Sequence, residues 1–303
     1  MNYIYESKVH DPYVNIAMEK QLAEKLVDGI LLFLWQNDQT VVIGRNQNPY
    51  QECNLDYMKQ YNIRLARRYS GGGAVFHDLG NVNYTLIMRE KAFDIERVKR
   101  FLLRMTQNLH IECEFTGKND MTIQGAKFSG HAYFVENEIQ VFHGTIMVDL
   151  HLEQLGKTLT PSMKKLQSKG IQSVKSRVAN LHQINDEITV ERVKNSFYDA
   201  FQKEFGVAES IIFFDETSVD KQKIEELKSH HWLYEQTPTF SIVLEKRYPI
   251  GMVSLNLKVV DHKVLLARIY SDSLKTDWSE IEKEIEGKNF CPEQLWALLE
   301  TQI

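Results

Sequence analysis

The spacing of apolar and polar residues predicts secondary structure along most of the chain. Apolar residues recur every three to four positions in five segments, at 15–27, 55–61, 94–109, 190–205 and 219–229, which predicts helices. Aliphatic and β-branched residues cluster at 30–35, 40–43, 63–67, 74–77 and across 121–148, which predicts strands. In the first helix, Ile16, Leu22, Ala23 and Leu26 form an apolar stripe, so we expect its charged residues on the opposite face.

The pattern changes after Trp232. Three alternating segments at 240–244, 252–260 and 263–269 predict strands, and two helical patterns follow at 278–286 and 292–302. These elements form a small α+β unit of about 60 residues, near the lower size limit of a domain. We therefore predict a larger mixed domain over 1–244 and a small C-terminal domain over 245–303.

Composition and charge narrow the class of protein. The chain has 303 residues, which suits two domains at about 150 residues each. Its 36 basic and 41 acidic residues give a net charge of −5, so neither nucleic acid nor an anionic membrane is an expected partner. An anionic substrate must be held by local positive charge.

Location and redox state follow from three further features of the sequence. The longest fully apolar run, Ile30–Trp35, is far shorter than the roughly 20 residues of a membrane span, and no signal peptide is evident. The three cysteines, Cys53, Cys113 and Cys291, are odd in number and widely spaced, which disfavours disulfides and a zinc site. We expect a cytoplasmic protein.

The densest chemical motif runs from Arg67 to Asn81 and contains the run Gly71-Gly72-Gly73. Consecutive glycines let the backbone approach a ligand closely, and successive N–H groups can bind an anion. Arg68 adds a fixed cation. A glycine-rich surface turn explains the same residues, and the third glycine of a dinucleotide-binding motif would fall at Phe76.

Three weaker signals follow. Lys127 lies between glycines and precedes Ser129-Gly130, His143-Gly144-Thr145 interrupts an apolar strand, and Lys164–Arg177 carries five positive charges and no acid. A solvated lysine, a hydrogen-bonded core histidine and a solvated basic face explain these signals equally well when each is taken alone.

Taken together and in this order, the segments resemble the lipoate–protein ligase A family of the biotin/lipoate ligase superfamily. The resemblance rests on Thr40–Pro49, Arg67–Asn81, Asn119-Asp120, Lys127–Gly130, His143–Thr145, Ser168–Leu181, Pro238–Phe240 and Tyr270–Leu274. It covers nearly the whole chain. It implies an α+β fold, with a mixed-sheet catalytic domain like the core of class II tRNA synthetases and biotin ligases and a small C-terminal accessory domain.

The resemblance also implies a reaction. Lipoate and ATP give lipoyl-AMP and pyrophosphate, with Mg²⁺ assisting, and a lysine of a carrier protein then takes the lipoyl group. Such carriers are the lipoyl domain of a 2-oxoacid dehydrogenase E2 or the glycine cleavage H protein. We expect the basic stretch Lys164–Arg177 to help capture an acidic carrier.

Residue roles are implied by the same match. Lys127 is the expected catalytic residue, and Asp120 the expected magnesium ligand. The ATP-binding positions implied are Arg68, Gly73, Ala74, Val75, Phe76, Asn119, Asp120 and Lys127. The lipoate-binding positions implied are Arg68, Ser70, Gly71, Gly72, His77, Lys127, Ser129, Gly130, His143 and Thr145.

Some residues depart from the family pattern, and other functions stay open. Lys118 replaces the usual arginine, and Glu235 replaces a glycine in Trp232-Leu233-Tyr234-Glu235, where the small domain is expected to swing. The alternatives are an octanoyl or lipoyl transferase that uses a catalytic cysteine without ATP, a biotin ligase, and a non-catalytic carrier-binding protein.

Overall fold

The structure is a computed structural model that describes residues 2–117, 119–159, 178–235, 242–260, 263–273 and 277–301. Its main element is an eight-stranded sheet in the order β11-β1-β2-β6-β10-β9-β8-β7. The strands are β1 (Asn2–Ser7), β2 (Ile30–Trp35), β6 (Asn81–Arg89), β7 (Glu114–Thr116), β8 (Asp120–Ile123), β9 (Ala126–Glu136), β10 (Ile139–Met147) and β11 (Ala208–Phe214). Strand β1 runs parallel to β2 and β11, and the other neighbours are antiparallel. The predicted mixed sheet is confirmed.

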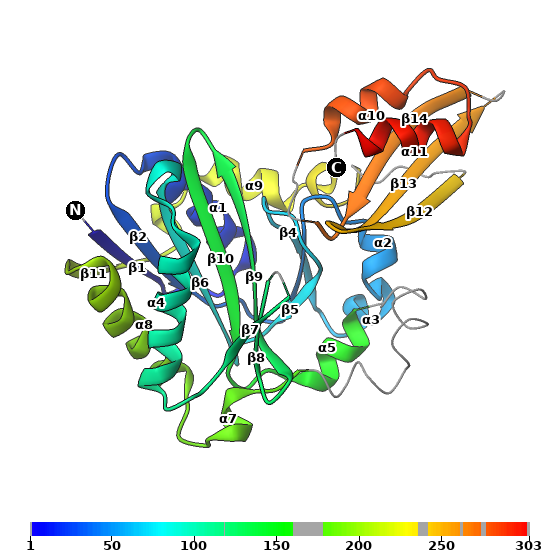
Figure 1. The fold of residues 1–303 in the computed structure, drawn as a ribbon. Helices are drawn as coiled ribbons and strands as arrows, with labels where there is room; N and C mark the ends of the chain where they lie inside the picture. Colours follow the sequence, from blue (N-terminus) through cyan, green and yellow to red (C-terminus); the bar gives the residue numbers. More distant parts are fainter. Residues whose placement is uncertain are drawn as a thin grey trace.

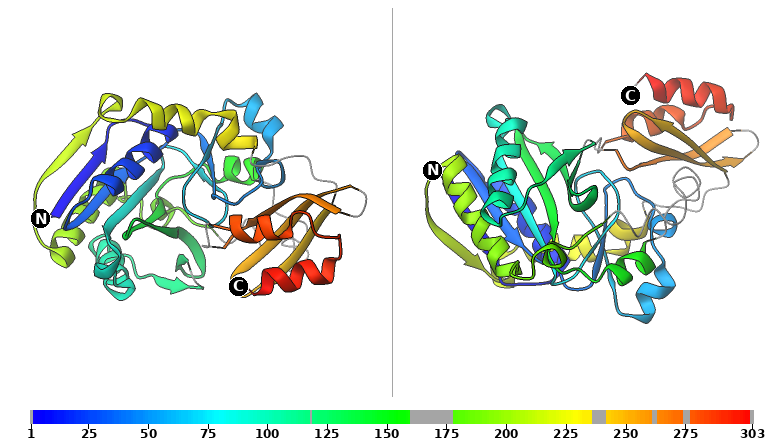
Figure 2. Two further views of the ribbon diagram at one scale, coloured as in Figure 1. Left: turned by 90° about the horizontal axis from the view of Figure 1, so that it is seen from above. Right: turned by 60° about the horizontal axis from the view of Figure 1, so that its bottom comes forward.

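Helices cover both faces of this sheet (Figure 1; Figure 2). Helices α1 (Pro12–Lys25) and α9 (Lys221–Lys228) pack together on one face, and α4 (Ile95–Asn108) and α8 (Val190–Phe205) on the other. Side chains at helical spacing explain the packing of α4, because Val98, Phe101, Leu102 and Met105 are all buried. The central strand β6 is buried over nearly its whole length, as expected for a strand covered on both faces.

Helix α1 departs from the expected arrangement of charges. It begins at Pro12, where Asp11 caps it by accepting from the Tyr13 and Val14 N–H groups. Glu19 lies on the buried side and is only 1% exposed, so the expectation that all its charged residues face away from the core is wrong. A buried carboxylate must be hydrogen-bonded to be tolerated, which makes the surroundings of Glu19 informative.

A second, three-stranded sheet carries the glycine-rich motif. It consists of β4 (Arg64–Arg67), β3 (Thr40–Ile43) and β5 (Val75–His77), in that order, with the glycine run between β4 and β5. The short helices around it and below the main sheet are α2 (Pro49–Glu52), α3 (Leu55–Gln60), α5 (Leu152–Thr158) and α7 (Leu181–Ile184).

The C-terminal residues form a small α+β unit beside the main body (Figure 1). Strands β12 (Ile242–Tyr248), β13 (Gly251–Val260) and β14 (Lys263–Ser271) form an antiparallel sheet that α10 (Ser279–Ile285) and α11 (Pro292–Glu300) cover. The unit has its own apolar core. The domain division predicted between residues 244 and 245 falls within strand β12. This division stays a prediction. Among the residues that the structure describes, no helix has the length and apolar character of a membrane span.

The junction between the two units is anchored by a buried arginine. Residues His231–Glu235 form one π-helical turn. The Arg67 guanidinium donates to the carbonyl oxygens of Trp232 (3.0 Å) and Leu233 (2.9 Å), and Trp232 Nε1 donates back to the Arg67 carbonyl (3.0 Å). Burial lowers the pKa of Arg67 to about 10, so the guanidinium keeps its charge at neutral pH. Lys118, Lys164–Arg177, residues 236–241 and Leu274 lie outside the described residues.

Candidate active site

One cavity of about 270 Å³ gathers most of the residues that the sequence singled out. Strands β5, β8, β9 and β10 and the glycine loop supply its walls. The predicted residues that line it are Arg68, Gly72, Gly73, Ala74, Val75, His77, Asn119, Asp120, Lys127, Gly130, His143 and Thr145. These residues come from four separate motifs of the sequence, so the fold brings the motifs together.

Four of the predicted residues lie behind the cavity wall. Ser70 and Ser129 are fully buried, and Phe76 packs in the core beneath the glycine loop. The Gly71 carbonyl accepts from Arg68 Nη2 at 2.7 Å. These groups can shape the site, and their direct contact with ligand stays a prediction.

The charged end of the cavity holds Lys127 and Asp120. Lys127 Nζ lies 2.7 Å from Asp120 Oδ1, and both side chains are more than one third exposed. Strand pairing places Asp120 opposite Gly130. A Cβ at Gly130 would lie 2.8 Å from Lys127 Nζ, so the glycine leaves room for the ammonium group. An exposed ion pair contributes little to stability, so a ligand can separate these charges at small cost.

Arg68 braces the glycine loop from inside. Its Nη2 donates to the carbonyl oxygens of Gly71 (2.7 Å) and Gly73 (2.8 Å), and its Nη1 to that of Val42 (3.2 Å). Burial lowers its pKa to about 10, against the charge of Glu19, so Arg68 stays a cation at neutral pH. The loop and the positive charge are therefore fixed in one unit before any ligand arrives.

The other end of the cavity contains a chain of hydrogen bonds around His143. His143 Nδ1 lies 2.8 Å from Glu19 Oε1, and His143 Nε2 lies 2.6 Å from Ser70 Oγ. Because a carboxylate only accepts, Nδ1 carries the hydrogen in its contact with Glu19, and Nε2 faces the Ser70 hydroxyl. Arg68 Nε donates to the same hydroxyl at 3.0 Å, and Thr85 Oγ1 donates to Glu19 at 2.7 Å. Each member thus has a defined orientation.

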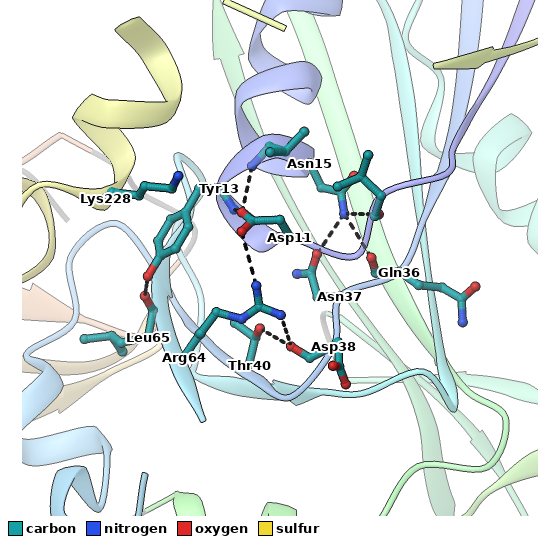
Figure 3. A network of polar contacts seen from close by, with 12 residues as sticks. Asp11, Tyr13, Asn15, Gln36, Asn37, Asp38, Thr40, Arg64, Leu65 and Lys228 are labelled. Carbon is teal, nitrogen blue, oxygen red and sulfur yellow. Dashed lines mark hydrogen bonds and ion pairs between the residues drawn. The ribbon is translucent and has the colours of Figure 1, made fainter. Parts of the chain in front are cut away.

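His77 is a neutral donor at this end. Figure 3 shows the polar network beside α1, in which Asn15 Nδ2 donates to the Gln36 carbonyl (2.9 Å) and to Asn37 Oδ1 (3.0 Å). The Asn37 amide is therefore oriented with its nitrogen toward His77 Nδ1, 3.2 Å away. His77 Nδ1 must accept, so Nε2 carries the hydrogen.

Burial and the charges of Arg68 and His143 lower the pKa of His77 to about 3. His77 Nε2 is buried and has no hydrogen-bond partner among the described residues. A buried donor without a partner is costly. Because His77 lines the cavity, this N–H is a candidate ligand contact.

Glu19, Trp35, His131 and Asp272 also line the cavity, and none of them was predicted as a site residue. A signal for Glu19 was present, because it lies three residues from both Ile16 and Leu22 on the apolar stripe. Asp272 lies within the segment Tyr270–Leu274 that supports the family resemblance, but its place in the site depends on how the small unit docks.

The oxygen groups at the charged end fit a magnesium ion carried by a nucleotide. Asn119 and Asp120 line the cavity together, and carboxylate and amide oxygens suit Mg²⁺. Among the described residues there is no cluster of three or more metal-binding side chains. Mg²⁺ commonly keeps water and phosphate ligands and takes one or two protein carboxylates, so one carboxylate beside an amide agrees with such a site.

The sheet, the two-ended cavity and the accessory unit together define an α+β enzyme that binds a small molecule. Residues 11–202 match the lipoyl protein ligase A/B catalytic domain, and residues 237–303 match the bacterial lipoate protein ligase C-terminus. The chain belongs to this family and is an enzyme of the ligase class.

The chain is also similar to individual relatives. It is 35% identical to the lipoate-protein ligase A of Psychrobacter cryohalolentis over 93% of this chain and 86% of the relative. It is 35% identical to that of Bdellovibrio bacteriovorus over 95% of this chain and 88% of the relative.

Three solved structures share the fold. P. falciparum LipL1 in complex with lipoate superposes with a TM-score of 0.84 and 26% identity, covering 99% of this chain and 94% of that one. Lipoate-protein ligase A bound with ATP superposes with a TM-score of 0.60 and 24% identity, covering 77% of this chain and 94% of that one. The third is the bi-partite lipoate protein ligase of Thermoplasma acidophilum, which was studied with its E2 lipoyl domain. It superposes with a TM-score of 0.70 and 23% identity, covering 80% of this chain and 99% of that one.

Proposed function

We propose that the chain activates lipoate with ATP and transfers the lipoyl group from lipoyl-AMP to a lysine of a carrier domain. The observation that carries this proposal is one cavity with two ends. A movable cation, Lys127, stands beside Asp120 at the exposed end, and buried groups joined by hydrogen bonds close the other end. The structures of similar fold with lipoate, with ATP and with a partner lipoyl domain support the choice of substrates.

The first step joins two anions. Lipoate enters with its apolar part toward Trp35 and His143, and its carboxylate toward Arg68 and Lys127. A carboxylate oxygen attacks the α-phosphorus of ATP, the new P–O bond gives lipoyl-AMP, and pyrophosphate leaves. Lys127 moves from Asp120 to the α-phosphate as negative charge grows there, where a preorganised cation is most effective. Asn119 and Asp120 would hold a magnesium ion, which would supply positive charge against the phosphates.

The second step transfers the acyl group. The neutral ε-amine of the carrier lysine attacks the acyl carbon, and the bond from that carbon to the phosphate oxygen breaks, so that AMP leaves. The amine gives up one proton as the amide forms. A free lysine has a pKa near 10.4, and a site that excludes water lowers it. Lipoyl domains and the H protein are the proposed acceptors, and the cytoplasm is the proposed location. The division at residues 244 and 245 and the predicted binding residues belong to the same proposal.

A transferase that uses a cysteine is less well supported by the site. None of the three cysteines is among the described residues that line the cavity. Burial raises the pKa of Cys53 to about 12 and also raises that of Cys113, which makes both poor nucleophiles. Cys291 lies in the small unit, at the start of α11.

Pyrophosphate release from ATP, measured without a carrier, tests the proposal. Release that requires lipoate is expected, and Lys127→Ala is expected to lower its rate by about 10²–10³. Lys59→Ala, on the exposed side of α3, is the matched control and leaves the rate unchanged. No release, with acyl transfer still occurring from one carrier to another, would replace the ligase with the transferase. No activity in either assay would favour a carrier-binding protein.

A further inference from the structure

The small C-terminal unit contributes a carboxylate to the active-site cavity. Among the described residues, Asp272 is the single residue beyond Glu235 that lines this cavity. Its segment is hydrogen-bonded to the large unit on both sides of Asp272. Gly72 N donates to the Ser273 carbonyl at 2.8 Å, and Ser271 N donates to the Asn46 carbonyl at 2.9 Å. The position of Asp272 against the glycine loop is therefore set by backbone contacts.

The carboxylate itself is held in a prepared place. Met252 N donates to Asp272 Oδ1 at 2.7 Å. A Cβ at Gly251 would lie 2.3 Å from the same oxygen, and Gly251 has a φ of +135°, which only glycine adopts readily. The start of β13 thus leaves room for the carboxylate and supplies it with a backbone donor. Such a fixed polar group suits a positioned ligand contact.

The charge of Asp272 restricts what it can touch. The substrates of the proposed reaction are a carboxylate and a triphosphate, and a carboxylate beside either would repel it. Arg68 and Lys127 are the cations of the same cavity and suit the phosphate and the lipoate carboxylate. Asp120 already carries the negative charge beside Lys127. Asp272 therefore matches an uncharged part of the nucleotide that offers hydrogen-bond donors.

A ribose meets this requirement better than the other neutral groups. Its two neighbouring hydroxyls can donate to a carboxylate, and a carboxylate on a ribose hydroxyl is a recurrent contact in nucleotide-binding proteins. We propose that Asp272 accepts hydrogen bonds from the ribose hydroxyls of ATP, so that the small unit takes part in lipoate activation. This inference rests on the proposed function, because it presumes that ATP occupies the cavity.

Nucleotide binding by the full chain tests the inference directly. Affinities for ATP, 2′-deoxy-ATP and 3′-deoxy-ATP are measured by calorimetry with Mg²⁺ present, for the wild type and for Asp272→Asn. We expect the wild type to prefer ATP over at least one deoxy analogue by about 10- to 100-fold, the range of a hydrogen bond to a charged group. In Asp272→Asn the preference shrinks toward one, because ATP binding weakens and binding of that analogue hardly changes.

Two controls separate this contact from a structural effect. The amide side chain of the Asp272→Asn variant keeps an oxygen that can accept from Met252 N, and an unchanged thermal midpoint would show that the small unit stays folded. Glu280→Gln removes the same charge from an exposed position at the start of α10 and should keep the wild-type preference for ATP. Pyrophosphate release with each nucleotide should follow the same ratios.

Several outcomes would overturn the inference. An unchanged ratio in Asp272→Asn would remove the ribose contact. If Asp272→Asn loses a preference of the wild type for ATP over purine riboside triphosphate, Asp272 contacts the adenine amine instead. If the variant needs more Mg²⁺ than the wild type to bind ATP, Asp272 contacts the metal instead. A defect seen only when purified lipoyl-AMP reacts with a carrier would assign Asp272 to the acceptor lysine. If the wild type binds ATP but releases no pyrophosphate, the proposed function is refuted, and the affinity ratio still decides the role of Asp272. If the wild type binds no ATP, both the proposed function and the inference are refuted.

Discussion

The two ends of the cavity differ in exposure and in how firmly their side chains are fixed. At one end Lys127 and Asp120 form an ion pair with both side chains more than one third exposed. At the other end Glu19, His143 and Ser70 are buried and joined by hydrogen bonds of 2.6–2.8 Å. The exposed pair can exchange partners at little cost, whereas breaking the buried chain strands polar groups.

The difference suits two tasks. Recognising a mostly apolar acid needs walls that do not move and few charges, while activating it with ATP needs cations that follow the developing charge. Arg68 belongs to both ends, because it donates to Ser70 and also to the carbonyls of the glycine loop. It therefore couples the fixed end to the loop that we assign to the nucleotide.

Breaking the fixed end should have the largest effect. In Glu19→Ala the Thr85 hydroxyl and His143 Nδ1 both lose their acceptor, and each stranded donor costs about 1–3 kcal/mol. We expect the free energy of unfolding in urea to fall by about 2–6 kcal/mol, and the KM for lipoate to rise more than that for ATP. Glu19→Gln keeps one acceptor oxygen and should lose less. An equal rise in both KM values would contradict separate ends.

Displacing the movable cation should have a smaller effect, on rate alone. In Gly130→Ala the new Cβ meets Lys127 Nζ at 2.8 Å and pushes it aside. A shift of this kind at a reacting group can cost about 10² in rate, and we expect that loss in lipoate-dependent pyrophosphate release with unfolding unchanged. Gly156→Ala is the control, because its Cβ would have no heavy atom within 4 Å. Equal losses in both variants would refute the role of Gly130.

The pH dependence of stability should show whether His77 stays neutral at the buried end of the cavity. Burial holds the pKa of His77 at about 3, against an ordinary value of 6.5. Below pH 6.5 the unfolded chain binds a proton that the folded chain does not, so this contribution to stability falls as pH falls, until about pH 3. Between pH 6.5 and 5.0 the loss is about 2 kcal/mol. Urea unfolding of the wild type and of His77→Gln at both pH values should show this extra loss of stability only in the wild type. If both proteins lose the same free energy of unfolding between these pH values, His77 does not have the lowered pKa.

The sequence predicted part of the fold closely, for a physical reason. Strands Ile30–Trp35 and Thr40–Ile43 and helix Val190–Phe205 agree with the prediction at both ends, because each has a clear apolar pattern and polar neighbours. Strands β1, β6 and β11 were missed. Strand β6 is covered on both faces, so it lacks the alternation that marks a half-exposed strand. Strand β11 shows an irregular burial pattern at the edge of the sheet.

The site residues likewise fall into predicted residues and missed residues. The motif residues around Arg68, Lys127 and His143 were identified because family resemblance marks them, and the structure places them around one cavity. Glu19 and Asp272 were missed because their roles arise from tertiary contacts. Glu19 meets His143 across 124 positions of sequence, and Asp272 reaches the cavity only through the docking of the small unit.

Isolation of the intermediate tests the central claim most directly. The protein is incubated with ATP, Mg²⁺ and lipoate, freed of small molecules by gel filtration, and divided in two. Mass spectrometry of one half should detect bound lipoyl-AMP, and the other half should modify an apo lipoyl domain without added ATP. Lys127→Ala should form lipoyl-AMP about 10²–10³ times more slowly than the wild type. Absence of lipoyl-AMP from wild type that nevertheless moves a lipoyl group between two carriers would contradict the account.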